Sequence, residues 1–291
     1  MFKKIKKYLW FFSLFLSIFL RSDTNYEFMI VHKIDPLCQE NKILMEKKRY
    51  HNYDITISRA EDWICQSITI EKDGKLFFRN EEIGGYYFLS DRFEKHENPF
   101  FFFAGKNNPY FVFSKWTGGA HCCYSLHIFS LGKDFRKVAS IDGGNSQPIL
   151  KDLDGDRIPE IEVLDDFLAY QFSSFAMSAF GTVVLKYSYG KYQVSSELMK
   201  KPPPSPNHWK SKIESWKNDL RRKDPDWPSP SLIQTMTDLI FTGNKKVAFD
   251  LIHSIWPPDV SGKNNFLTAY EEALKQSNFY PEFEKQLKPL Q

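Results

Sequence analysis

The chain lacks the features that mark several large classes of protein. Beyond the first 22 residues, no apolar run approaches the roughly 18 residues of a membrane-spanning helix, which excludes a multi-span membrane protein. Beyond residue 22 the chain also has no excess of basic over acidic residues. Residues 1–22 hold five of the 39 basic residues and no acid, so the remainder carries 34 basic against 36 acidic residues. That balance, a net charge of −2, argues against a general nucleic-acid-binding protein.

Short catalytic motifs are missing as well. The sequence contains no H-E-x-x-H, no P-loop and no G-x-G-x-x-G, and residues 144–148 fail G-x-S-x-G at its last glycine. The candidate acid–base residues are Glu162, Asp165 and Asp166, and the candidate catalytic histidine is His121, which precedes a thiol. None of these forms a recognisable catalytic pattern. We therefore expect a protein that is not an enzyme, and an exported hydrolase whose site residues are distant in sequence is the alternative.

The composition is that of a globular protein. Hydrophobic residues make up 42% and charged residues 26% of the 291 residues, and phenylalanine alone occurs 27 times. This length suits one large domain or two ordinary ones, with ample apolar material for a core.

The N-terminus has the pattern of a secretory signal peptide. Residues 1–7 are basic, residues 8–20 are apolar apart from two serines, and Arg21 ends the run. A helix of this apolar length spans only about 20 Å, which is short for a membrane crossing. We expect residues 1–22 to be a cleaved signal peptide and the protein to be periplasmic or secreted. The alternatives are an uncleaved membrane anchor and a buried N-terminal helix.

Four cysteines follow this segment, at Cys38, Cys65, Cys122 and Cys123. An even number in an exported chain suggests disulfides, and four cysteines allow three pairings. Adjacent residues of a strand point to opposite faces, so we expect Cys122 and Cys123 to bond to Cys38 and Cys65 and not to each other. Buried thiols are one alternative, and a zinc site is another, although three consecutive ligands fit a tetrahedral ion badly. The zinc site would use His121, Cys122, Cys123 and His127.

Residues 25–199 are expected to form a β domain. Its first part, residues 25–48, is polar, and a short helix is expected at residues 39–47. Further along, Asp73-Gly74 has the pattern of a hairpin turn. The many short, regularly spaced strand patterns indicate antiparallel sheets in a propeller-blade-like or sandwich arrangement. The expected strands are residues 53–58, 65–70, 76–79, 86–89, 100–103, 109–116, 124–131, 135–141, 158–164, 181–189 and 191–195.

The pattern changes at residues 200–206, which contain four prolines and predict a stiff linker. Beyond it, apolar residues recur with a helical period, so residues 207–291 predict a small all-α module. Ser205-Pro206 and Ser229-Pro230 are each expected to begin a helix, with serine at the N-cap and proline at the first helical position. Two further helices are expected around Val247–Ile255 and Phe266–Leu274.

Residues 152–160 carry the strongest local motif. Carboxylates stand at alternate positions and again at the ninth, spacing that lets a loop curl around a hard cation such as Ca²⁺. Residues 151–166 hold seven acids and two bases, so the acids would repel one another without a cation. A solvated acidic turn without an ion is the alternative. The expected calcium ligands are Asp152, Asp154, Asp156, the carbonyl of Ile158 and Glu160.

Two departures separate this loop from an EF-hand. Val163 occupies the position of the twelfth-residue glutamate, and the loop leads into a strand pattern instead of a helix. Arg157 stands where a left-handed backbone favours glycine, at a cost of about 1 kcal/mol. The affinity for calcium should therefore be weak.

At these residues the chain resembles the FG-GAP/VCBS-type repeats of exported bacterial proteins, whose calcium loop D-x-D-G-D-G-x-P-[DE] leads into an apolar strand. Pro159 and Ile161 match the strand entry of the motif, and Arg157 departs from it. The resemblance covers residues 98–197, with a second, degenerate loop at 104–112 related to 154–162 by an offset of 50 residues. It implies propeller-like blades and a binding role, without an activity.

These observations lead to one expectation of function. We expect an exported binding or scaffold protein whose β domain is stabilised by one structural calcium ion, with a protein or glycan as partner. No nucleic-acid partner is expected, and membrane contact is expected only through an uncleaved N-terminal segment. A secreted effector delivered to a host is a further alternative.

Overall fold

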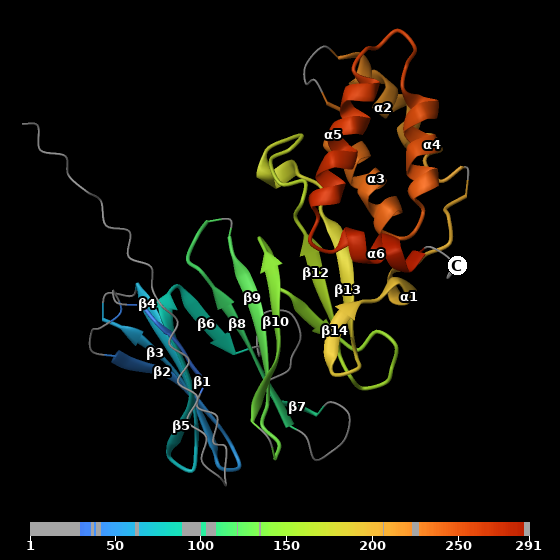
Figure 1. Ribbon diagram of the computed structural model, residues 1–291. Coiled ribbons are helices and arrows are strands. Elements are labelled where there is room, and N and C mark those ends of the chain that lie inside the picture. Colours follow the sequence, from blue (N-terminus) through green and yellow to red (C-terminus); the bar gives the residue numbers. More distant parts are fainter. Residues whose placement is uncertain are drawn as a thin grey trace, which may run out of the picture.

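The computed structural model describes residues 30–35, 38, 42–61, 64–88, 100–102, 109–120, 122–133, 135–205, 207–222 and 227–287. The expected signal peptide, His121 and the degenerate loop at 104–108 lie outside these residues. The described part contains three β-sheets that follow one another along the chain, and then a group of helices (Figure 1). The expected fold class, mainly antiparallel β with a C-terminal helical module, is confirmed. Among the described helices, none is long and apolar enough to cross a bilayer.

The first sheet has five strands in the order β1-β5-β4-β3-β2. β1 runs parallel to β5, and the other pairs are antiparallel. The β4–β5 turn is Asp73-Gly74, as expected, with φ of 51° and 75°, the left-handed values of a tight hairpin. The strands are β1 (Ile30–Ile34), β2 (Lys42–Tyr50), β3 (Tyr53–Ala60), β4 (Cys65–Lys72) and β5 (Lys75–Ile83).

The helix expected at residues 39–47 is wrong, because residues 42–50 form β2. This strand lies at the edge of the sheet and pairs with β3 along its length. None of its residues is fully buried, and its sequence does not alternate between apolar and polar residues as a half-buried strand does. Pairing with β3 therefore decides its conformation, and local sequence preference does not.

The second and third sheets are antiparallel. The second has the order β10-β9-β8-β6, with β7 pairing the other part of β8, and the third has the order β11-β12-β13-β14. Each contains a meander of three sequential strands, β8-β9-β10 and β12-β13-β14, and only Tyr189-Gly190 separate β13 from β14. The strands are β6 (Gly85–Phe88), β7 (Phe100–Phe102), β8 (Pro109–Trp116), β9 (Tyr124–Ser130), β10 (Arg136–Gly144), β11 (Ile149–Lys151), β12 (Glu160–Asp165), β13 (Gly181–Ser188) and β14 (Lys191–Val194).

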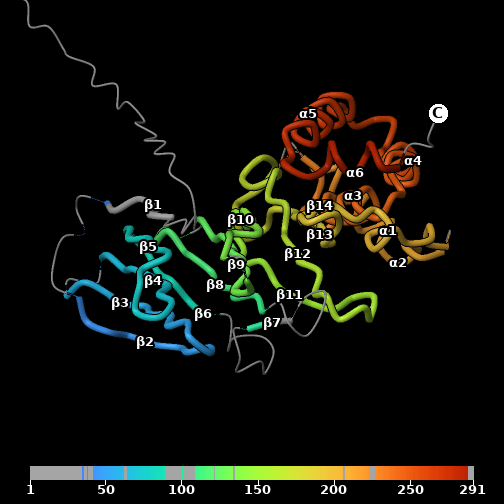
Figure 2. The backbone as a smooth tube through the Cα atoms, turned by 60° about the horizontal axis from the view of Figure 1, so that its bottom comes forward, coloured from blue at the N-terminus to red at the C-terminus, as the bar shows by residue number. Residues whose placement is uncertain are grey.

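The second sheet lies between the other two, and both of its faces are covered. Phe111, Phe113 and Phe129 pack with the first sheet, whereas Val112 and Leu126 belong to a core shared with the third sheet and the helices. Figure 2 shows the three sheets side by side from the N-terminal to the C-terminal part. Burial of both faces explains why β8 is a continuous apolar run without alternation.

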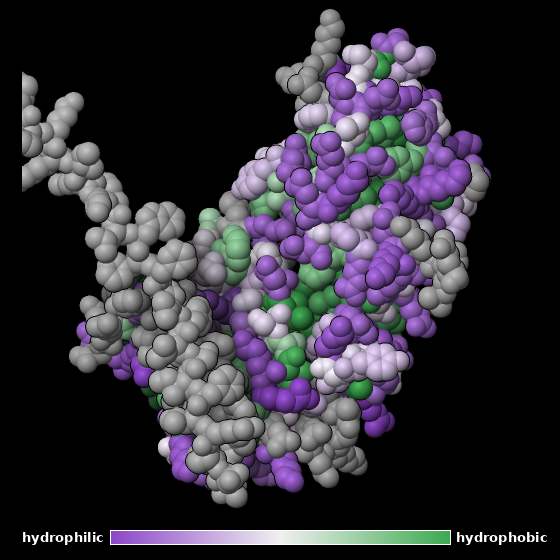
Figure 3. Space-filling model, viewed as in Figure 1, coloured by the Kyte–Doolittle hydropathy of each residue, from purple (hydrophilic) through white to green (hydrophobic). Residues whose placement is uncertain are grey.

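The helices pack on the third sheet, chiefly through α3 against β13. At this contact a Cβ on Gly181 would lie 2.6 Å from the buried ring of Phe241, so only glycine lets the strand approach the helix. Figure 3 shows apolar side chains among hydrophilic ones over the helices and beside β14. The helices are the 3₁₀-helix η1 (Phe175–Met177), α1 (Ser196–Met199), α2 (Lys210–Arg221), α3 (Pro230–Phe241), α4 (Lys245–Ile255), α5 (Lys263–Gln276) and α6 (Tyr280–Leu287).

Two details of the helical expectations can be compared with the structure. Ser229 is the N-cap residue of α3 and Pro230 lies in its first turn, as expected. The helix expected to begin at Ser205-Pro206 begins instead at Lys210. The amide of His208 donates to the carbonyl of Ser205, which forms a separate turn before the helix.

Candidate metal loop and vicinal disulfide

The acidic motif forms the loop between β11 and β12, two antiparallel strands in which Lys151 pairs with Glu160. The loop's own carboxylates hold its backbone. Asp152 accepts hydrogen bonds from the amides of Gly155 (2.8 Å) and Arg157 (3.2 Å). In the same way, Asp154 Oδ1 accepts from the amide of Asp156 (3.1 Å), and Asp156 Oδ1 accepts from the amide of Ile158 (2.7 Å). The alternating spacing thus produces a tight curl.

The backbone of this curl turns left-handed twice. Gly155 has φ of 80° and Arg157 has φ of 68°. The left-handed conformation expected at Arg157 is therefore present. A residue other than glycine adopts it at a cost of about 1 kcal/mol. This cost falls on the folding of the loop, where the hydrogen bonds to the aspartates offset it.

Three of the expected ligands converge. One carboxylate oxygen each from Asp152, Asp154 and Asp156 lie within 4.8 Å of one another, and all three residues are exposed. Hard cations such as Ca²⁺ take six to eight oxygen ligands, so three carboxylates would form half of such a site.

Glu160 differs from the three aspartates because it is fully buried. Its Oε2 accepts a hydrogen bond from the amide of Leu153 (2.8 Å), whereas its Oε1 is buried and has no partner among the described residues. Burial raises the pKa of this carboxyl, and the charges of Asp154 and Asp156 raise it further. A buried acid with one unpartnered oxygen beside two other acids is the donor set that a cation would satisfy.

A positive charge already reaches the loop from β13. Lys186 Nζ contacts Asp154 Oδ2 and lies 3.6 Å from Asp156 Oδ2. Its hydrogen bond is the main cause of the lowered pKa of Asp154. Sequence analysis missed Lys186 because it lies 32 residues from Asp154, and only the pairing of β12 with β13 brings the two together.

The first disulfide joins Cys38 to Cys65, with the Cα atoms 5.5 Å apart. Both cysteines are buried, in a small cluster with Ala60. Cys65 is the first residue of β4, so the bond attaches Cys38 to one end of the central strand of the first sheet.

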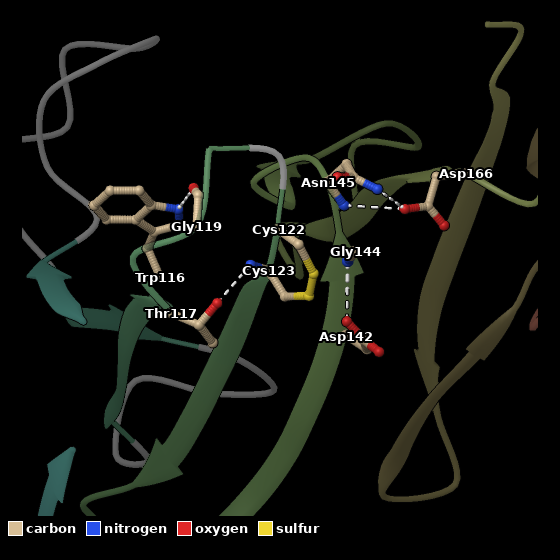
Figure 4. Close-up of a disulfide and its surroundings, with 9 residues drawn as sticks. All are labelled: Trp116, Thr117, Gly119, Cys122, Cys123, Asp142, Gly144, Asn145 and Asp166. Carbon is tan, nitrogen blue, oxygen red and sulfur yellow. Dashed lines mark hydrogen bonds between the residues drawn. A yellow bond between two sulfur atoms is a disulfide. The ribbon is translucent and has the colours of Figure 1, made fainter. Parts of the chain in front are cut away.

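The second disulfide joins Cys122 to Cys123, with Cα atoms 3.0 Å apart (Figure 4), and the expected pairing of each with Cys38 or Cys65 is wrong. That expectation depended on both residues lying in a strand, where neighbours point to opposite faces. The two residues instead lie in the loop before Tyr124, the first residue of β9. With both sulfurs bonded, neither cysteine offers a thiolate to zinc or to a Cys–His nucleophile.

The vicinal disulfide is held by the backbone around it. The amide of Cys123 donates to Thr117 Oγ1 (2.7 Å), and the amide of Thr117 donates to the carbonyl of Cys123 (3.1 Å). The Trp116 indole closes the loop by donating to the carbonyl of Gly119 (3.1 Å). Figure 4 shows the sulfur atoms on the side of the loop that faces Gly144 in the neighbouring strand β10.

The candidate acid–base residues do not form one site. Glu162 pairs with Lys151 (2.6 Å), Asp165 is buried and accepts from Ser277, and Asp166 accepts from the amide of Asn145 (3.2 Å). The three carboxylates therefore have three separate structural partners.

Strand pairing does create one group that the sequence did not suggest. His127 Nε2 lies 3.0 Å from the Ser125 hydroxyl, and its Nδ1 lies 3.1 Å from the Ser140 hydroxyl. The imidazole stacks on Phe113 at 4.9 Å between ring centroids. Ser140 is the cross-strand partner of His127 in β10, so no local motif could have indicated the group.

Comparison with known proteins identifies one similar chain of unassigned role. No protein-family model matches the sequence, and no solved structure matches it. The chain is 28% identical over 123 residues to the uncharacterised protein y4bJ of Sinorhizobium fredii (strain NBRC 101917 / NGR234). The matched region is 41% of this chain, and it spans only 19% of the length of y4bJ. This similarity indicates a related segment and carries no activity.

Proposed function

We propose that the protein is an exported binding or scaffold protein, not an enzyme, whose β-sheets are stabilised by one structural Ca²⁺. The carrying observation is the unpartnered buried oxygen of Glu160, whose carboxyl interacts electrostatically with Asp154 and Asp156 of the three converging aspartates. Calcium would be held by Asp152, Asp154, Asp156, Glu160 and the carbonyl of Ile158, with water completing six or seven oxygens. The resemblance of residues 152–160 to FG-GAP/VCBS-type loops supports the same assignment.

The role of the ion would be structural. It would fix the turn that begins β12 and offset repulsion among the carboxylates. The ammonium of Lys186 opposes tight binding, so the dissociation constant should lie around 10⁻⁴–10⁻³ M, as in extracellular modules. Such a constant suits the periplasm or the cell exterior, which is where residues 1–22 are proposed to send the chain.

The distribution of possible catalytic groups favours binding over hydrolysis. A hydrolase should have a deep pocket with histidine and acids converging. The described residues include a pocket of about 310 Å³ between the first and second sheets, lined among others by Tyr50, His51, Tyr53 and Lys133. None of its lining residues is acidic. We also propose that the protein binds another protein or a glycan.

Thermal unfolding of the exported protein in calcium and in chelator tests the proposal. At a calcium concentration ten times the dissociation constant, linkage adds about 1.4 kcal/mol, which should raise the Tm by about 3–5 °C. Asp154→Asn should abolish this shift, whereas Asp259→Asn, an exposed aspartate after α4, should keep it. If calorimetry detects no binding at millimolar Ca²⁺ and chelator leaves the Tm unchanged, the loop is only an acidic turn.

A further inference from the structure

Lys186 is the cation that the fold places against the acidic loop. It lies in β13, one residue beyond Leu185, which pairs with Ile161 at the start of β12. Its ammonium contacts Asp154 and lies 3.6 Å from Asp156 Oδ2. Its charge also acts on Glu160, so Lys186 interacts with three of the five proposed calcium ligands.

The other cation of the loop does not share this position. Arg157 is exposed, and the ion pairs among the described residues include none that involves it. Its backbone amide, and not its guanidinium, is bonded to Asp152. The loop's acidic charge is therefore balanced across the sheet by Lys186 and not from within the loop.

We propose that Lys186 is a tethered counter-ion that calcium must displace, a proposal that rests on the calcium-binding function proposed above. An ammonium bonded to Asp154 occupies a carboxylate oxygen that the ion requires. Lysine suits such an exchange because its ammonium is a point charge on a flexible four-carbon stem, able to leave for water without moving the strand.

This exchange has two physical consequences. In the absence of calcium, Lys186 relieves the repulsion among the carboxylates, so the curl persists without an ion. When calcium binds, the bond between Lys186 and Asp154 must break and the displaced ammonium remains near a divalent cation, which weakens the observed affinity. Because the pair is partly exposed, the effect on affinity should be about three- to tenfold.

Calcium titration calorimetry and thermal unfolding of full-length variants test this exchange. Lys186→Met keeps the apolar stem and removes the charge, and Lys191→Met, at an exposed lysine of the neighbouring strand β14, is the matched control. Lys186→Met should bind calcium about three- to tenfold more tightly than wild type and should have a lower Tm in chelator. Lys191→Met should resemble wild type in both measurements, and Lys186→Arg, which keeps the charge, should bind calcium no more tightly than wild type.

The outcomes separate this inference from the calcium function itself. If wild type and Lys186→Met both fail to bind calcium, the calcium function falls, and this inference falls with it. If both proteins bind calcium and Lys186→Met binds it no more tightly than wild type, the calcium function stands and the proposal of a tethered counter-ion is overturned. If only Lys186→Met binds, the calcium function of the wild-type protein falls, and displacement of Lys186 by calcium is overturned because the lysine then holds the loop in place of the ion. Should Lys186→Met not fold, Lys186→Gln provides the same comparison with a polar stem.

Discussion

The carboxylate of Asp165, at the end of β12, accepts a hydrogen bond from the hydroxyl of Ser277, 112 residues later in the chain. The same hydroxyl accepts from the amides of Phe279 (3.1 Å) and Tyr280 (2.7 Å), at the start of α6. One buried serine therefore links the third sheet to the first turn of the last helix. This contact attaches the start of α6 to the third sheet.

This contact should make stability depend on pH. Burial raises the pKa of Asp165 from 3.8 to about 6, and the neighbouring charge of Asp166 adds to the increase, while Ser277 and the amides of Phe167 and Phe279 oppose it. The folded state thus binds a proton more readily than the unfolded state between these two values. Stability should fall as pH rises from about 4 to 6, by up to roughly 3 kcal/mol from this group.

Asp165→Asn should remove that part of the pH dependence. The variant should be more stable than wild type above pH 6, and the difference should vanish below about pH 4, as measured by urea unfolding across this range. Asp259→Asn is the control, because Asp259 is exposed and should leave the profile unchanged. A constant difference between Asp165→Asn and wild type at every pH would contradict the assignment.

Glu160→Gln should separate ion binding from ion-free stability. Without calcium, the amide removes a buried charge next to Asp154 and Asp156 and can still accept from Leu153, so the Tm in chelator should not fall and should rise by up to a few degrees. With calcium, the variant should lose the upward shift, because a ligand charge is gone. Glu162→Gln on the same strand is the control and should keep the shift. A Glu160→Gln protein that still responds to calcium would remove Glu160 from the ligand set.

The two disulfides should contribute unequally to stability. Cys38–Cys65 closes a loop of 27 residues, for which chain entropy gives about 3.5 kcal/mol, whereas Cys122–Cys123 joins neighbours and constrains almost no unfolded chain. Replacing both residues of the first pair by serine should therefore cost about 3 kcal/mol in urea unfolding. The same replacement of the second pair should cost less than about 1 kcal/mol. Peptide mapping without reductant should give one peptide pair linked through Cys38 and Cys65, and any link from either of these to Cys122 or Cys123 would contradict the pairing.

The export proposal predicts a shortened N-terminus. Sequencing of the protein recovered outside the cytoplasm should begin near residue 23, because the basic start and short apolar run of residues 1–22 suit a signal peptidase substrate. Leu14→Arg, which interrupts the apolar run, should leave the chain uncleaved and inside the cell. If the exported wild-type protein starts at Met1, residues 1–22 are not cleaved and the prediction of a cleaved signal peptide is wrong.

The sequence by itself determined most of the β-strands and the order of strand-rich and helical parts. Where a strand has a pleated, half-buried pattern, as in β3, or is apolar on both faces, as in β8, its own residues specify it. The curl at residues 152–160 was also specified locally, since the aspartates bond to amides only two to five positions away. The fold class and the acidic loop could be predicted for this reason.

Only the tertiary structure decided the contacts between distant segments. β2 is a strand because β3 pairs with it, and Cys122 bonds to Cys123 because the chain leaves the strand before it reaches them. The position of Lys186 against Asp154, the pairing of His127 with Ser140 and the bond from Ser277 to Asp165 all depend on which strands and helices become neighbours. Short-range patterns record the conformation of a segment, but a contact between segments also requires the register and packing of both, and those are set by burial across the whole core.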